Sequence, residues 1–176
     1  DKMIDAGYNR YLSAFEILIP ALVNSFEKNV SVNDSLYLQL NDVIRVLKEW
    51  DYYSSETSIA TTIAIEWAEK LSSTLRRIYI DEGWDDQVTL TKKFSATATK
   101  DELLLPLATV VKNLENRFGK WQIPWGEINR YQRVSADINQ PYNDEQPSIP
   151  VGFASSAWGM LPSYNSRYMG DYKKRY

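Results

Sequence analysis

The side chains that most often carry enzyme chemistry are missing from this chain, which has neither His nor Cys among its 176 residues. This excludes Ser-His-Asp triads, zinc sites built on pairs of His, and thiolates as nucleophiles or metal ligands. Hydroxyl groups are plentiful, and Ser155 and Ser156 are the nearest candidate nucleophiles. They do not lie in a G-x-S-x-G pattern and have no neighbouring base to activate them.

Carboxylates are the other groups that could do acid–base work. Asp51 with Glu56 and Asp81 with Asp85 are candidate pairs, although ordinary solvated faces explain both equally well. The acidic segment 81–86 has the ligand type that Ca²⁺ prefers, but its spacing does not match an EF-hand loop. We therefore assign it as a solvated loop and predict no metal site and no cofactor.

Charge and hydropathy exclude further classes of function. The net charge of −3 provides no basic field for nucleic acid or an anionic membrane. The Arg76-Arg77 and Lys92-Lys93 doublets lack the interleaved aromatic residues of a nucleic-acid groove. The longest apolar run, 17–23, contains Pro20 and is too short to span a bilayer, and we find no signal peptide.

The elements that must position any site are predicted to be helices over the first two thirds of the chain. Apolar residues recur at steps of three and four over about residues 5–27, 36–50, 59–78 and 100–118. Asn33, Asp34 or Ser35 is the expected cap of the second helix, and Ser54 or Ser55 that of the third. Thr99 and Glu102 predict a capping box for the fourth, with Gly119 just past its end.

Residues 120–176 have a different character because Pro and Gly replace the helical stripes. Two short strands are predicted at 128–134 and 151–157, each needing a partner from outside this chain. We expect residues 137–150 to form a long loop, and residues 171–176 to form a solvated, frayed end. The predicted fold is therefore mainly α, with a helical region 1–119 and a strand-and-loop region 120–176. These regions form either one domain or a domain and the start of a closing sheet.

Two segments of the chain carry distinctive motifs. The first is a Leu-x-x-Trp-Asp stretch, Leu47 to Asp51, followed by Ser58, Ala60 and Trp67. The second comprises Trp121 and the run Pro124 to Arg130, which contains the pattern Trp-Gly-x-x-x-Arg. Both segments resemble the penicillin acylase family, in which Trp-Gly-x-x-x-Arg is a signature. The likeness spans about residues 1–165 and continues in the style of acyl-homoserine-lactone and aculeacin acylases, through Asp1, Tyr11 to Leu22, Gln132-Arg133 and Pro150 to Phe153.

The resemblance implies an N-terminal nucleophile hydrolase with an αββα fold, which cleaves amides of apolar acyl groups. In this family the N-terminal Ser of the large subunit attacks the carbonyl, and its own α-amine is the base. That mechanism needs no His. The resemblance implies no cofactor, leaves a structural Ca²⁺ open in the complete enzyme, and indicates a periplasmic or extracellular location.

The same resemblance implies that the nucleophile lies outside this chain, since Asp1 cannot serve as one. We expect an internal fragment of the large (β) subunit that is inactive alone, with the small subunit and the preceding part of the large subunit as partners. No catalytic residue is assigned. The motif residues are expected to be structural: Trp50 packs under the next helix, Asp51 caps it, Trp125 and Gly126 turn into a strand, and Arg130 bridges to a carboxylate, with Trp67 carried on a helix.

A function of a different class fits the composition alone. Amphipathic helices with 6 Trp and 12 Tyr suit a non-catalytic module that binds another protein. An aromatic carbohydrate-binding domain is less favoured because the stripes are helical.

Overall fold

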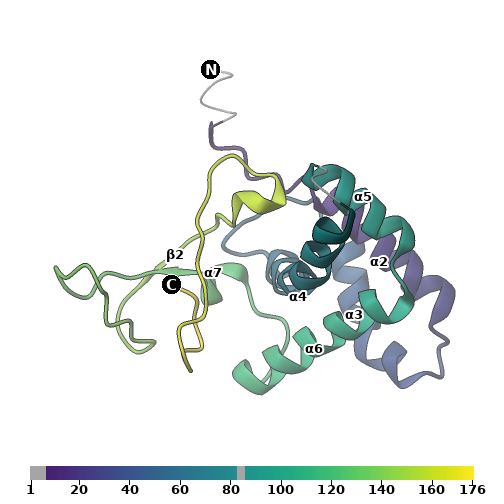
Figure 1. The fold of residues 1–176 in the computed structure, drawn as a ribbon. Helices are drawn as coiled ribbons and strands as arrows, with labels where there is room; N and C mark the ends of the chain where they lie inside the picture. Colours follow the sequence, from purple (N-terminus) through teal and green to yellow (C-terminus); the bar gives the residue numbers. More distant parts are fainter. Residues whose placement is uncertain (1–6, 83–85) are drawn as a thin grey trace.

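The computed structural model describes residues 7–82 and 86–176, with the side chains of all of these except 72, 73 and 76–82. The fold is mainly α, as predicted (Figure 1). The principal helices are α2 (Phe15–Asn29), α3 (Ser35–Lys48), α4 (Ile59–Glu82), α5 (Gln87–Thr97) and α6 (Lys100–Phe118). A short helix α7 (Trp125–Ile128), strands β1 (Arg130–Tyr131) and β2 (Ile149–Pro150), and a 3-10 turn η1 (Ser156–Trp158) follow them.

The core lies between the helices, and the predicted apolar stripes point into it. Helix α4 contacts α3, α5 and α6, while α2 packs against α3, α5 and α6. The stripes supply fully buried side chains such as Leu22, Leu40, Ile63 and Leu107. Burial of these faces is the main source of stability for helices of this length. None of the described helices is both long and apolar enough to cross a membrane.

The first helix begins later than predicted. Residues 5–27 were expected to be one helix, but α2 starts at Phe15 and continues through Pro20 to Asn29. Residues 10–12 are extended instead, because the Leu12 N–H donates to the Tyr52 carbonyl at 2.9 Å and the Ser54 N–H donates to the Arg10 carbonyl at 3.0 Å. Pairing with a distant segment therefore overrides the local helical spacing.

The predicted cap of α6 is confirmed, because two side chains at the start of the helix each bond the other residue's main chain. The Thr99 side chain accepts from the Glu102 N–H, the Glu102 side chain accepts from the Thr99 N–H, and Gly119 ends α6 with φ 79°. The prediction of Ser54 or Ser55 as the cap of α4 is wrong, because the Ser58 hydroxyl accepts from the Thr61 N–H.

Other details near the helix ends also differ from expectation. Asp34 takes the N-cap position of α3, but its carboxylate accepts from the Ser31 N–H rather than from a helical N–H. Helix α5 was not predicted, because only Leu90, Thr91 and Phe94 on it are buried. Asp86 caps this helix by accepting from the Val88 and Thr89 N–H groups. The remainder of the acidic segment, including the Asp81 and Asp85 candidates, lies outside the described side chains.

The strand predictions are wrong in extent and in partner. Residues 125–128 form α7, and β1 covers only Arg130–Tyr131. Strand β2 lies at Ile149–Pro150 instead of 151–157, which is an extended stretch followed by the 3-10 turn. The two strands pair with each other in antiparallel register, Arg130 opposite Pro150 and Tyr131 opposite Ile149. Pairing within the chain thus satisfies the strands that were expected to need an outside partner.

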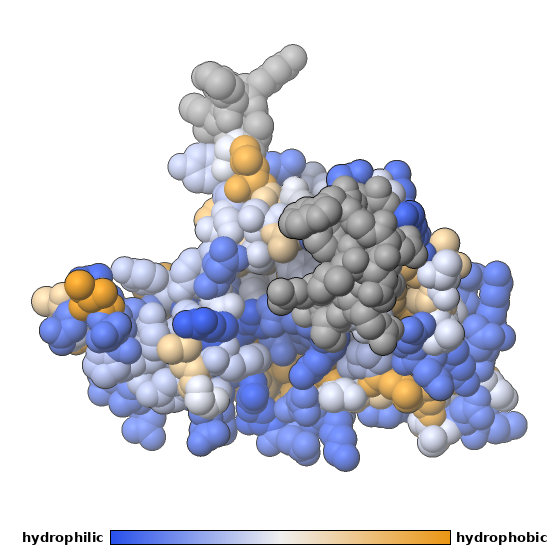
Figure 2. Space-filling view, viewed as in Figure 1, coloured by the Kyte–Doolittle hydropathy of each residue, from blue (hydrophilic) through white to orange (hydrophobic). Residues whose placement is uncertain are grey.

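Polar side chains order the loop between β1 and β2. Gln132 is buried, and its amide donates to the Asn143 carbonyl at 2.8 Å while its carbonyl accepts from the Asn143 N–H at 2.8 Å. The loop projects from the helical body (Figure 1), and Ile138 on it is 99% exposed. Apolar side chains are otherwise scattered among polar ones on the face seen in Figure 2.

The end of the chain is packed against the protein rather than frayed. Arg175 and Tyr176 are 4% and 7% exposed. Residue 175 pairs with Asn129 on one side and with Tyr168 on the other. The prediction of a solvated end was wrong because this segment supplies both a buried cation and a buried ring.

Candidate functional site

The first family-like stretch covers the end of α3 and the start of the connection to α4, which begins with a turn at residues 49–53. The Asp51 carboxylate accepts from the Tyr53 N–H at 3.0 Å, so it stabilises the turn itself and does not cap α4 as predicted. Tyr52 in this turn has a φ of 64°, which is rare for a residue with a side chain. Trp50 packs against Phe15 with ring centres 5.4 Å apart, and its indole N–H donates to the Tyr53 carbonyl.

Trp67 is the central aromatic residue of the helical core. Its side chain is fully buried, and its indole N–H donates to the Leu103 carbonyl of α6 at 2.9 Å. This bond satisfies a carbonyl near the start of α6, so Trp67 joins α4 to α6 through both packing and hydrogen bonding.

The second family-like stretch anchors the irregular region to the helices. Trp125 is 1% exposed, and its indole N–H donates to the Phe153 carbonyl at 3.2 Å. The Gly126 N–H donates to the Glu56 carbonyl at 2.8 Å, and a Cβ on Gly126 would lie 2.9 Å from that oxygen. Only glycine allows this approach. Both residues lie in α7, which corrects the prediction that they turn directly into a strand.

Arg130 binds neutral acceptors instead of the predicted carboxylate. Its Nη1 donates to the Gly126 carbonyl at 2.8 Å, and its Nε donates to the Ser148 hydroxyl at 2.9 Å. Its Nη2 donates to the Ser148 carbonyl. The guanidinium therefore ties α7 to the residue that precedes β2.

Asn129 was not recognised as important from the sequence, although it lies within the second stretch. Its side chain is fully buried, and its amide donates to the Val151 carbonyl at 2.6 Å and the Phe153 carbonyl at 2.9 Å. Its side-chain oxygen accepts from the Ser166 hydroxyl. A single amide therefore connects three segments. Its position in the sequence between Trp125 and Arg130 was the feature that could have marked Asn129 as important.

Arg175 and its two carboxylate partners were also missed. Arg175 Nη1 lies 2.7 Å from Glu66 Oε1 and 2.9 Å from Glu69 Oε2, and its Nη2 bonds the other Glu69 oxygen. Burial raises the pKa of Glu66 despite the opposing charge of Arg175, and the Glu69 charge adds to the rise. Burial by itself would lower the pKa of Arg175, but its bonds to Glu69 and the charge of Glu66 raise it.

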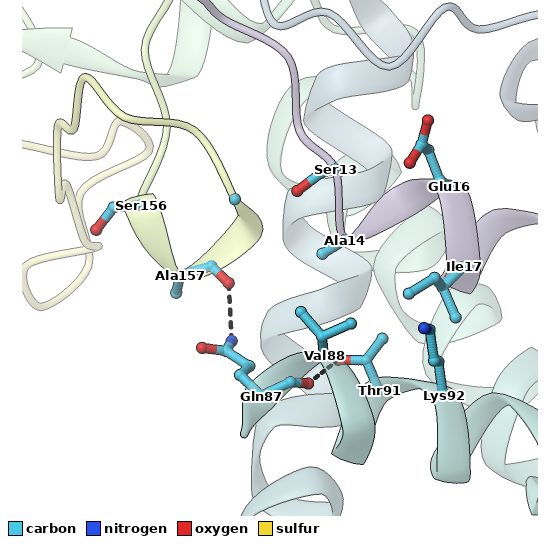
Figure 3. A pocket seen from close by; sticks show the side chains of 11 residues that line it. Ser13, Ala14, Glu16, Ile17, Gln87, Val88, Thr91, Lys92, Ser156 and Ala157 are labelled. Atoms are coloured by element: carbon cyan, nitrogen blue, oxygen red, sulfur yellow. Dashed lines mark hydrogen bonds between the residues drawn. The ribbon is translucent and has the colours of Figure 1, made fainter. Parts of the chain in front are cut away.

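A cavity of about 400 Å³ lies where the start of α2, the start of α5 and the 3-10 turn meet (Figure 3). Ala14, Ile17, Val88 and Ala157 supply its apolar wall. The Gln87 amide donates to the Ala157 carbonyl at 2.8 Å across one side. This volume and lining suit a small, mostly apolar group. Trp50, Asp51, Trp67, Trp125, Gly126 and Arg130 do not line it.

Polar groups around this cavity do not form a nucleophile and base pair. The Glu16 carboxylate accepts from the Tyr11 hydroxyl, which together with some burial raises the pKa of Tyr11 to about 12. Ser13 on the wall has no hydrogen-bonded base among the residues that the structure describes. The Ser155 hydroxyl, a sequence candidate, accepts from the Ala157 N–H and so caps the 3-10 turn.

The acidic candidates do not assemble into a metal centre. Glu56 Oε2 lies 3.5 Å from Arg10 Nη1, while the Asp51 carboxylate accepts from the Tyr53 N–H within its own turn. Within residues 7–82 and 86–176, no three acidic side chains with described positions gather around one point. Among the motif residues, Trp125, Gly126, Asn129 and Arg130 lie close together, and Arg175 joins them. Trp50 and Asp51 lie together at a second position, and Trp67 lies at a third.

Comparison with known proteins identifies the family to which this fold belongs. No curated protein sequence matches the chain. The model of the penicillin amidase family matches residues 1–160, which include α2 to α7, both strands and the cavity wall. Because that match covers most of the chain, the chain belongs to the penicillin amidase family.

Proposed function

We propose that this chain is a non-catalytic supporting part of an amidohydrolase that cleaves amides of apolar acyl groups. The nucleophile is an N-terminal Ser outside these residues, and the chain by itself is inactive. The single observation that carries the proposal is that the family-like side chains are engaged in packing and in hydrogen bonds to the main chain.

Those engagements leave little capacity for catalysis. The indole N–H groups of Trp67 and Trp125 each donate to a carbonyl, and both rings are buried. The Arg130 guanidinium donates to Gly126 and Ser148. A catalytic acid, base or oxyanion donor must reach the substrate, and these donors point into the protein.

The nucleophile is the second part of the proposal. An N-terminal Ser needs only its own α-amine as a base, which suits a chain without His. The described Ser hydroxyls around the cavity lack a base, which supports a nucleophile in another part of the enzyme. The partners proposed are the small subunit and the preceding part of the large subunit.

Substrate class and location rest on resemblance. The likeness to acyl-homoserine-lactone and aculeacin acylases favours an aliphatic or aromatic acyl group on the scissile amide. The same family resemblance supports a periplasmic or extracellular enzyme. Penicillins, lactone signals and lipopeptides are all consistent with the sequence.

The test compares this chain with the product of its complete gene. Both are assayed with phenylacetyl, octanoyl and acetyl p-nitroanilides, and both are treated with a sulfonyl fluoride that labels activated Ser. We expect no hydrolysis and no labelling of the chain alone. The complete product should hydrolyse the apolar amides faster than the acetyl amide and be labelled at a new N-terminal Ser.

Two outcomes would overturn the proposal. Hydrolysis by the chain alone would place a catalytic group among these residues. A complete product that is no longer than this chain and is inactive would favour the helical protein-binding module. Sequencing the coding DNA on both sides of the segment decides the length independently of activity.

A further inference from the structure

We propose that residues 166–176, here called the strap, lock one edge of β1 against helix α4, with Arg175 as the residue that holds the strap closed. Loss of the Arg175 contacts opens the strap and exposes the β1 edge, while the helical core stays folded. The inference does not depend on the enzyme activity proposed above.

Main-chain bonds show that the strap occupies a strand position. The Arg130 N–H donates to the Arg175 carbonyl at 2.9 Å, and the Arg175 N–H donates to the Ile128 carbonyl at 2.8 Å. Residues 167 and 176 exchange two N–H to carbonyl bonds of 3.1 Å. Residues 174–176 therefore lie between β1 and residues 166–168, and they satisfy main-chain groups that would otherwise form an open strand edge.

Side chains from three elements form a socket for the Arg175 guanidinium. Glu66 and Glu69 project from α4, and the Trp125 ring of α7 has its centre 5.4 Å from Arg175 Cζ. Tyr168 of the strap lies between two cations, with Arg175 Cζ 5.3 Å and Arg117 Cζ 3.9 Å from its ring centre. Arg175 Nη2 also donates to the Ser166 carbonyl at 2.8 Å.

This socket makes Arg175 the attachment of the strap to α4. On the side of the β1–β2 loop, Asp144 accepts from the Lys173 N–H, the Lys174 N–H and the Tyr176 hydroxyl. The Arg175 side chain is 4% exposed and the Glu66 side chain 13% exposed. Removing the guanidinium takes from the mostly buried Glu66 carboxylate its 2.7 Å bond to a cation, which is strongly unfavourable, and takes from the strap its side-chain bonds to α4. Helix α7 keeps its own anchors, because the Trp125 and Gly126 N–H groups donate to the Ser58 and Glu56 carbonyls. Opening is therefore local to the strap and β1.

The experiment measures amide hydrogen exchange by mass spectrometry in the full chain. In Arg175→Met we expect exchange in residues 128–131 and 166–176 to become at least about tenfold faster. Exchange in α6 should stay unchanged. Arg175→Lys keeps the charge but loses the two-pronged geometry, so an intermediate acceleration is expected.

The matched control is Arg167→Met, which removes an exposed guanidinium from the same strap. No described residue pairs with the Arg167 side chain, so this variant should exchange as the wild type does. Unchanged exchange of the strap in Arg175→Met would overturn the proposal. Equal acceleration in the strap and α6 would also overturn it, since opening would then be global. If Arg175→Met does not fold, Arg175→Lys decides by the same comparison.

Discussion

The helical region, residues 15–119, and the irregular region, residues 120–176, share one apolar cluster but differ in how much they depend on buried polar side chains. In the helical region, apolar stripes meet in a shared core, and polar groups act mainly at helix ends. In the irregular region, a few buried polar side chains bind main-chain carbonyls of distant segments, as Asn129, Arg130 and Gln132 do. Apolar side chains can move slightly and still pack, whereas a hydrogen bond weakens steeply when the donor and acceptor leave a narrow range of distance and angle.

That difference predicts how each region responds to the loss of one side chain. Loss of a core side chain should weaken the whole fold, because one apolar cluster spans α2 to α6 and extends to Trp125 and Ile128 of α7. Loss of one polar anchor should release particular segments of the irregular region.

Trp67→Ala should reduce the free energy of unfolding by about 4 kcal/mol, because it opens a cavity in the core and removes the bond to Leu103. Urea unfolding followed by far-UV circular dichroism measures the loss. Trp67→Phe retains most of the ring volume and should cost less than half as much. A loss below 1 kcal/mol in the Ala variant would contradict the central role of this ring.

Asn129→Ala should cost about 3 kcal/mol, because it removes the side-chain donor to the Val151 carbonyl and leaves the Phe153 carbonyl with the Trp125 indole alone. Hydrogen exchange should show the damage at residues 149–154 and 164–168 while α6 stays protected. Asn139→Ala, at an exposed position with no described side-chain bond, is the matched control. Uniform loss of protection across both regions would break the contrast between them.

Thr99→Ala should cost about 1 kcal/mol, because the Ala variant cannot accept the Glu102 N–H at the start of α6. Thermal unfolding should show a drop of roughly 2–4 °C. Thr109→Ala removes an exposed hydroxyl from the middle of the same helix, where it bonds the Leu105 carbonyl. If both variants lose equal stability, the capping box contributes nothing beyond an ordinary hydroxyl.

Glu66→Gln should have the smallest effect at neutral pH, because Arg175 keeps its bonds to Glu69. Because the pKa of Glu66 is raised in the folded state, there is a pH range just above 4.5 in which the folded state binds more protons at this group than the unfolded state does. Its contribution to stability is therefore greatest below pH 4.5 and falls as pH rises above that value. Urea unfolding from pH 4 to 7 should show this fall in the wild type and a smaller one in Glu66→Gln.

Glu115→Gln, at an exposed position on α6, controls for a general change in net charge. It should keep the wild-type pH dependence. If Glu66→Gln and the wild type have parallel stability profiles over this range, the pKa of Glu66 is not raised in the folded state.

Prediction from the sequence succeeded where a signal repeats or is local. The stripes of α3, α4 and α6 recur over several turns, and the Thr99–Glu102 box spans four residues. Helix α5 was not predicted because its buried face is short. The first helix was predicted too long because the Leu12 main chain pairs with that of Tyr52. The strands failed as predictions because their register depends on Asn129 and Arg130 binding residues about twenty positions away.

Residue types and local spacing were enough to predict the mainly helical fold class, the exclusion of His and Cys chemistry, the α6 cap and the family resemblance. The burial of Arg175, the use of Asp51 within its own turn and the position of the cavity became known from the three-dimensional arrangement. The reason is separation along the chain. Arg175 meets Glu66 and Glu69 across 109 and 106 residues, a distance over which residue spacing carries no periodic signal.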